Sequence, residues 1–122
     1  MLPTLHQNAY QKLLTLLRGL REQLDSPNSR VTVIQEKFQQ IQQVFQEEVM
    51  LLESDELEGT FASHFQSMQT EMHRALRLLG TDILFLRSSK QAATSEQRLA
   101  AIRDRVDNSI GFCQAILTFE SE

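Results

Sequence analysis

Four stretches of the chain carry apolar residues at three- and four-residue steps, the spacing that places them along one face of an α-helix. The first stripe consists of Leu5, Ala9, Leu13, Leu16, Leu17, Leu20 and Leu24. Pro3 suits a first helical turn, and the cluster from Asp25 to Ser29 is typical of a helix end. We therefore expect the first helix to lie between these two signals.

The second stripe keeps the alternating three- and four-residue steps of a bundle helix, and Glu48 is the one polar residue at a position of the stripe. It consists of Val31, Ile34, Phe38, Ile41, Phe45 and Leu52. Most of the positions around it are glutamines, namely Gln35, Gln39, Gln40, Gln42, Gln43 and Gln46. An apolar stripe with a solvated glutamine back indicates a helix that packs on one side only. An acidic connector, residues 53–59, should follow.

The third stripe is the longest and extends over about seven helical turns. It predicts a helix from about residue 60 to about residue 90. It consists of Phe61, Phe65, Met68, Met72, Ala75, Leu79, Ile83 and Leu86. A second, shorter stripe of Leu78 and Phe85 appears only in the C-terminal half. These two residues either face another helix of the same bundle or form an exposed surface for a partner.

The fourth helix should begin after residues 91–93, with Thr94 or Ser95 as its N-cap and Glu96 in its first turn. Its expected buried face consists of Leu99, Ile102, Val106, Ile110, Cys113, Ile116 and Leu117. No β-hairpin pattern occurs along the chain.

Short connections favour antiparallel neighbours. The sequence therefore predicts an all-α, up-down-up-down four-helix bundle with a long third helix, formed as one domain over residues 1–122. Two alternatives stay open. A hairpin of longer helices could complete its core only as a homodimer, or the N-terminal half could pack loosely because Gly19 weakens the first helix.

Composition narrows the function classes. The 122 residues carry a formal net charge of −4, which argues against a nucleic-acid coat or an anionic membrane surface as the partner of the whole chain. We find no apolar run long enough for a membrane span and no export signal. Cys113 is the only cysteine, so no intramolecular disulfide forms. We therefore expect a cytoplasmic protein.

Candidate catalytic and metal-binding residues are few. His64 and His73 are nine residues apart, on opposite sides of one helix, and neither follows the Glu-x-x-His pattern of di-iron bundles, because Phe61 and Thr70 stand three residues earlier. Cys113 lies on an apolar helix face, where a thiol is buried and inert. We expect no catalytic residues, no metal and no cofactor, and hence no enzyme.

His73 keeps one alternative open, that of a signalling relay of the histidine phosphotransfer type, which is also a small four-helix bundle. The pattern of that class has Lys three residues and Gly four residues after the histidine. Leu76 and Arg77 stand at those positions here, and Gly80 follows too late. The pattern is therefore incomplete.

Two charge features go beyond ordinary solubility. Asp82 lies within an apolar run, so its carboxylate is either turned to solvent or paired with a cation, with Arg103 or Arg105 as partner. Residues 47–58 hold six acidic and no basic residues, whereas residues 74–105 hold seven basic against three acidic ones. In an up-down bundle this places an acidic end opposite a basic end that carries Arg87, Lys90 and Arg98, with Glu120 and Glu122 at the acidic end.

The C-terminal half carries a family resemblance in residues 77–86 (RLLGTDILFL), 90–94 (KQAAT), 98–99 (RL), 104–106 (DRV) and 112–117 (FCQAIL). Residues 1–5 (MLPTL) and 38–43 (FQQIQQ) add to it. With these segments the chain resembles the cyanobacterial heterocyst-frequency-control family PatD over nearly its whole length. The acidic connector is the region that matches the family least. No matched segment is catalytic, so the resemblance is one of general sequence.

The resemblance implies a small cytoplasmic regulator of heterocyst differentiation that binds the tubulin-like cell-division protein FtsZ. In a unicellular cyanobacterium without heterocysts, a role in division would be the better description. The family supplies no matched binding residues.

The sequence itself proposes a partner surface on the third helix. An apolar centre with an arginine rim is a composition found at protein interfaces. The predicted partner-binding residues are Arg74, Arg77, Leu78, Phe85 and Arg87. FtsZ is expected to be acidic, so an arginine rim would speed its encounter with the chain.

Overall fold

The computed structural model describes residues 3–27, 30–52 and 59–118, and within them it contains helices and no β-strand. The elements are α1 (Thr4–Asp25), α2 (Val31–Val44), the π-helical turn η1 (Phe45–Val49), α3 (Gly59–Ser88) and α4 (Ala92–Thr118). The predicted all-α architecture with a long third helix is confirmed. Most of the predicted acidic connector, together with Glu120 and Glu122, lies outside the described residues.

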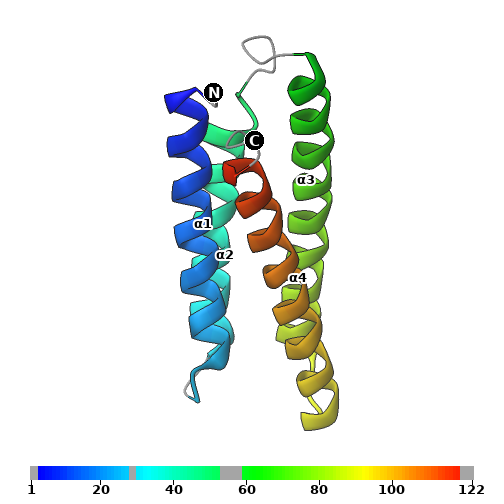
Figure 1. Cartoon of the computed structure of the whole chain (residues 1–122). Coiled ribbons are helices and arrows are strands. Elements are labelled where there is room, and N and C mark those ends of the chain that lie inside the picture. The colour runs from blue at the N-terminus through cyan, green and yellow to red at the C-terminus, as the bar shows by residue number, and fades with distance from the viewer. Residues whose placement is uncertain (1–2, 28–29, 53–58, 119–122) are drawn as a thin grey trace.

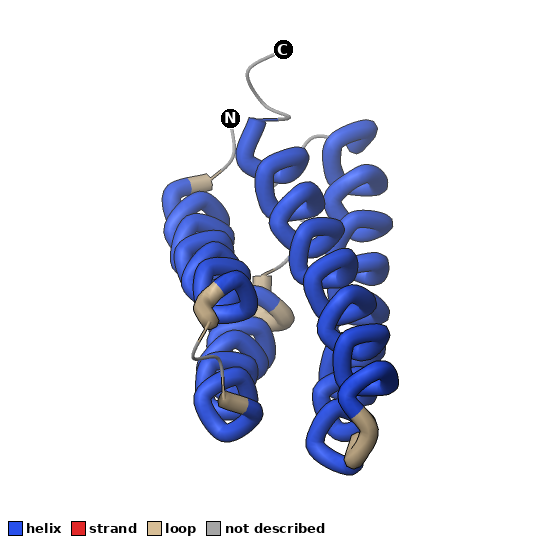
Figure 2. Tube along the Cα trace, turned by 90° about the horizontal axis from the view of Figure 1, so that it is seen from below, coloured by secondary structure: helices blue, strands red, loops and turns tan. Residues whose placement is uncertain are grey.

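The helices alternate in direction, as predicted (Figure 1). The start of α1, the end of α4 and the start of α3 lie at one end of the bundle, and the turn between α3 and α4 lies at the other. Seen end-on, α1 and α2 form one pair and α3 and α4 the other (Figure 2). α1 packs against both α2 and α4, and α3 packs chiefly against α4, whereas α2 and α3 share the smallest contact between adjacent α-helices.

α1 buries a wider face than the sequence indicates, because it contacts two helices. Its buried residues are His6, Ala9, Tyr10, Leu13, Leu14, Leu17, Leu20 and Leu24. The prediction was wrong at Leu5, which is 71% exposed, and Leu16 is only half-buried. The rings of His6 and Tyr10 point inward instead and contact Phe65 of α3, at centroid distances of 5.4 and 5.9 Å.

The polar break at Glu48 coincides with η1. A π-turn holds one residue more than an α-turn, and here the amide of Met50 donates to the carbonyl of Phe45 at 2.7 Å. The extra residue brings Val49 into the core in place of Glu48, which forms a 2.8 Å ion pair with Lys12 of α1. The amphipathic pattern is thus preserved without burying a carboxylate.

α3 follows its predicted stripe and adds to it. Phe65, Met72, Leu79, Ile83 and Leu86 are buried, while Phe61, Met68 and Ala75 are half-buried. Leu76 is buried as well, because α3 contacts α2 on one flank and α4 on the other.

α4 buries Ile102, Val106, Cys113 and Ile116 as predicted, with Leu99, Ile110 and Leu117 half-buried. The predicted N-cap was wrong. The helix begins at Ala92, and the amide of Ser95 already donates to the carbonyl of Gln91 at 3.0 Å within the first turn. Ser109 is also buried, which its hydroxyl permits by donating to the carbonyl of Arg105 at 2.9 Å.

Candidate partner-binding surface

The outer face of α3 carries the exposed apolar and basic residues that the sequence singled out. Leu78 is 41% and Phe85 48% exposed, so both face outward instead of packing inside another helix pair. Arg74 and Arg77 are exposed and lie on the same side in helical projection. We call Arg74, Arg77, Leu78 and Phe85 the arginine ridge.

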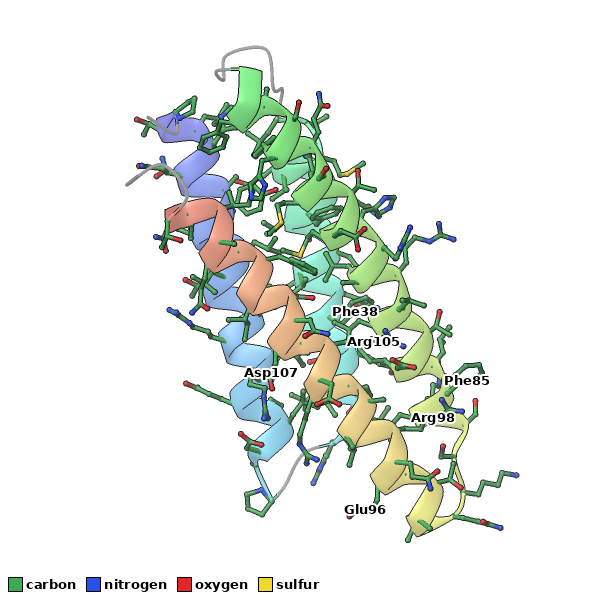
Figure 3. The ribbon with its side chains drawn as sticks, turned by 45° about the vertical axis from the view of Figure 1, so that its right-hand side comes forward. Phe38, Phe85, Glu96, Arg98, Arg105 and Asp107 are labelled. Carbon is green, nitrogen blue, oxygen red and sulfur yellow. The ribbon has the colours of Figure 1, made fainter. Side chains whose placement is uncertain are left out.

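Two further arginines were candidates for the rim of this ridge, and one of them contacts it. Arg87 is exposed in the last turn of α3, on the opposite flank from Leu78 and Phe85, so the structure does not group it with the ridge. Arg98 of α4 sits over the ring of Phe85, with its guanidinium carbon 4.6 Å from the ring centroid (Figure 3). This cation–π contact covers part of the ring and replaces Arg87 as the cation beside it.

Sequence reasoning missed Leu84, the most exposed large apolar residue of α3 at 58%. It sits in a continuous apolar run but belongs to neither of the two stripes predicted for the third helix. The available signal was its spacing: it stands seven residues after Arg77, which places both on one face of the helix.

Next to the ridge, between α2 and α3, lies a surface groove made of two adjoining hollows of about 400 and 250 Å³. Both hollows are lined by Gln42 of α2 and Arg77 of α3, so they adjoin. We call this surface the α2–α3 groove. Its lining residues are Gln35, Phe38, Gln39, Gln42, Phe45, Gln46, Met50, His73, Leu76, Arg77, Gly80, Thr81, Ile83 and Leu84.

At Gly80 the ring of Phe38 from α2 packs closely against α3. A Cβ atom added at Gly80 would lie 3.1 Å from Cε2 and 3.2 Å from Cζ of Phe38, closer than ordinary van der Waals contact. The glycine thus lets the Phe38 ring rest against the backbone of α3. The ring and Ile83 form an apolar floor, and the glutamines of α2 form one wall.

Among the described residues the lining of the groove carries an arginine and no carboxylate. Within the same part of the chain Arg77 forms no ion pair. Arg74 pairs with Glu71, with 3.8 Å between Nη1 and the carboxylate oxygen, and with no other carboxylate of the described residues. An exposed pair at that distance adds little, so both guanidiniums are available to an acidic ligand.

The carboxylate of Asp82 is paired, one of the two outcomes that the sequence allowed. Its side chain is 9% exposed and accepts a hydrogen bond from Nε of Arg105 on α4. Arg103, the other predicted partner, points elsewhere. It donates to the carbonyl of Leu24 at the end of α1 at 3.2 Å and lies 3.6 Å from Asp25.

The positive charge at the predicted basic end of the bundle is partly compensated by nearby carboxylates. Arg87, Lys90 and Arg98 lie near the turn between α3 and α4, as expected. Closer to the α1–α2 link, however, Nε and Nη1 of Arg21 bind Asp107 and Asp25, each at 2.8 Å. The pair with Asp107 joins α1 to α4, whereas the pair with Asp25 lies within α1.

The candidate chemical residues lie apart from one another. His73 is exposed and stacks on Phe45 at 5.7 Å between ring centroids, whereas His64 is half-buried. Cys113 is fully buried, and this burial raises the pKa of its thiol to about 12. Within residues 3–27, 30–52 and 59–118 no three His, Cys, Asp or Glu side chains are grouped to hold a metal ion.

Comparisons of the chain with protein-family models, curated proteins and solved structures give no match. Among the helices described, none combines the length and apolar character that crossing a bilayer requires.

Proposed function

We propose that this chain is a non-enzymatic regulatory protein that acts by binding a protein partner through the arginine ridge. The supporting observation is the exposure of Leu78 and Phe85 beside Arg74 and Arg77 on one face of α3. Interface centres are enriched in aromatic residues and arginine.

The PatD resemblance supplies the biological setting of this proposal. It points to FtsZ as the partner, to the cytoplasm as the compartment, and to heterocyst differentiation or cell division as the regulated process. An acidic partner would be attracted by Arg74 and Arg77 before contact, and Leu78 and Phe85 would then be buried. The arginines would govern the association rate, and the apolar pair the lifetime of the complex.

The test is capture of purified FtsZ by immobilised protein at several salt concentrations. We expect the double variant Arg74→Glu with Arg77→Glu to weaken capture about tenfold and to flatten its salt dependence. Its melting temperature should stay nearly unchanged, because exposed charges contribute little to stability.

A matched control reverses two exposed arginines elsewhere, Arg18→Glu with Arg30→Glu, and makes the same change in net charge. It should capture FtsZ almost as the parent does. If both double variants lose capture equally, net charge and not the ridge governs binding. Unchanged capture by the ridge variant would exclude this surface and leave the acidic residues 53–58 as the next region to test.

A phosphotransfer relay through His73 is the second candidate. The exposure of this imidazole is the observation in its favour, because a phosphoacceptor must be reachable. Incubation with a phospho-donor, followed by detection of acid-labile phosphohistidine, distinguishes the two. Label on His73 would favour the relay, and its absence would leave the binding protein.

A further inference from the structure

The α2–α3 groove combines three kinds of surface, one apolar, one of glutamine amides and one basic. Phe38 and Ile83 form an apolar floor, and the exposed Leu84 forms part of the α3 wall. The α2 wall is uncharged and rich in glutamine amides, which both donate and accept hydrogen bonds. Arg77 lines both hollows and is the charged residue that they share.

The shape of the groove suits a helix. From Gln35 of α2 to Gln46 of η1 this wall is about 16 Å long at about 1.5 Å per residue, which corresponds to about three turns of a bound helix. Both walls are themselves helices, and no strand edge in the described residues could pair with an extended peptide. A helix in such a groove inserts one apolar side chain per turn.

The positive charge of the groove favours a bound helix that carries negative charge. The lining, as far as the described residues form it, holds an arginine and no carboxylate, and the exposed Arg74 stands one helical turn from Arg77. Carboxylates beside the apolar stripe of a bound helix would reach these guanidiniums, whereas lysines there would be repelled.

We propose that the α2–α3 groove binds an amphipathic helix of an acidic protein partner, with its apolar stripe on Phe38, Ile83 and Leu84 and its carboxylates on Arg77. This inference rests on the proposed function in one respect, that the chain acts by binding a protein. It adds the site and the chemistry of the segment that fills it.

The test uses a display library of helical 16-residue peptides. One face of each peptide is randomised among apolar residues, and the flanking positions are randomised among Glu, Lys and Gln. Binders are selected on the full chain and then measured by fluorescence anisotropy. We expect the selected peptides to carry apolar residues at three- and four-residue steps and an excess of glutamate over lysine.

Two variants locate the bound peptide. Gln42→Glu places a carboxylate of nearly equal size between the two hollows, where it repels an acidic helix and competes for Arg77, so we expect about a tenfold loss of affinity. Gln40→Glu makes the same change on the opposite, exposed side of α2 and should alter affinity less than about twofold. Leu84→Ser should weaken binding as well, whereas Leu5→Ser, at an exposed leucine on α1, should not.

The proposal is overturned if no peptide is enriched, if lysine-rich peptides win, or if Gln42→Glu and Gln40→Glu weaken binding equally. Parallel FtsZ capture separates this outcome from that of the proposed function. If Arg74→Glu with Arg77→Glu abolishes FtsZ capture while Gln42→Glu has no effect on peptides or on FtsZ, the ridge binds the partner and the groove does not. If the peptides bind as expected but FtsZ does not, the groove stands and the named partner is wrong.

Discussion

The side of the bundle where α1 meets α4 is built differently from the side where α2 meets α3. On the first side Leu13, Leu17, Cys113 and Ile116 are fully buried. Arg21 adds an ion pair from α1 to α4 at its rim. Burial of this kind removes apolar area from water and leaves little surface that a ligand could reach.

On the second side the helices touch where Phe38 meets Gly80, and hollows lie along the line of contact. Glutamines border these hollows, and Arg77 lacks an ion-pair partner within the described residues. The stabilising contacts are therefore concentrated on the α1–α4 side of the bundle, and the surface open to a ligand lies on the α2–α3 side. Substitutions in the buried core should therefore change the free energy of unfolding, and those in the groove should change binding.

The largest effect is expected at a fully buried position of the α3 core face. Met72 is fully buried, so Met72→Asp would place an unpaired carboxylate there at a cost of several kcal/mol. Most of a small domain's stability of about 5–15 kcal/mol would be lost. The control is Leu78→Asp, which introduces the same residue on the outer face of α3. If urea unfolding shows both variants close to the parent, our account of the α3 core face is wrong.

A second effect should appear at alkaline pH on the α1–α4 side. Burial raises the pKa of Cys113 to about 12, above the ordinary value of 9.0 for this group. The folded state therefore keeps the thiol proton that the unfolded chain loses, and the free energy of unfolding should fall as the pH rises from about 9 to about 12. In Cys113→Ala this fall should be shallower by about 1.4 kcal/mol per pH unit.

Tyr10 lies on the same side, and burial raises its pKa too. Some alkaline destabilisation should therefore persist in Cys113→Ala. Chemical denaturation at a series of pH values measures both contributions. Identical pH profiles for parent and variant would mean that the thiol reaches water in the folded protein.

A smaller effect is expected at the ion pair between α3 and α4. Arg105→Met leaves the carboxylate of Asp82 buried and unpaired, whereas Asp82→Asn leaves a guanidinium that is already a third exposed. We expect Arg105→Met to cost about 2–4 kcal/mol and Asp82→Asn clearly less. Equal losses in thermal unfolding would contradict this asymmetry and would mean that Asp82 can turn to water.

The periodicity of the sequence was enough to predict the helices, their order and most of the core, because each stripe is long and its period unambiguous. The periodicity failed where the burial of one residue, or the first residue of a helix, depends on the surrounding structure. Leu5 is more apolar than His6, yet the phase of α1 is set by the whole helix, and His6 packs against Phe65. The start of α4 was misplaced because good capping residues occur inside its first turns.

The candidate site was only half predictable for a related reason. Leu78 and Phe85 were visible as a second stripe, but the sequence could not decide whether another helix covers them. The groove depends on how α2 and α3 pack, and this packing includes a close contact between distant residues, Phe38 and Gly80. No local pattern carries that information, and the π-turn that presents Met50 at the groove was visible only as a polar break at Glu48.

The smallest expected effect tests that close contact directly. Glycine inside a helix costs about 0.5–1 kcal/mol relative to alanine. Gly19→Ala and Gly111→Ala should each stabilise the protein by about that amount, because the added methyl group meets no atom within 4 Å beyond its chain neighbours and the local helix backbone. Gly80→Ala receives the same gain but places its methyl group 3.1 Å from the Phe38 ring. The ring must then shift or α2 and α3 must separate, and we expect the net stabilisation to be smaller or absent. Urea unfolding of the three variants supplies the comparison. If Gly80→Ala stabilises the protein as much as the other two, α2 and α3 part at no cost, and the contact between Phe38 and Gly80 does not hold the floor of the groove in place.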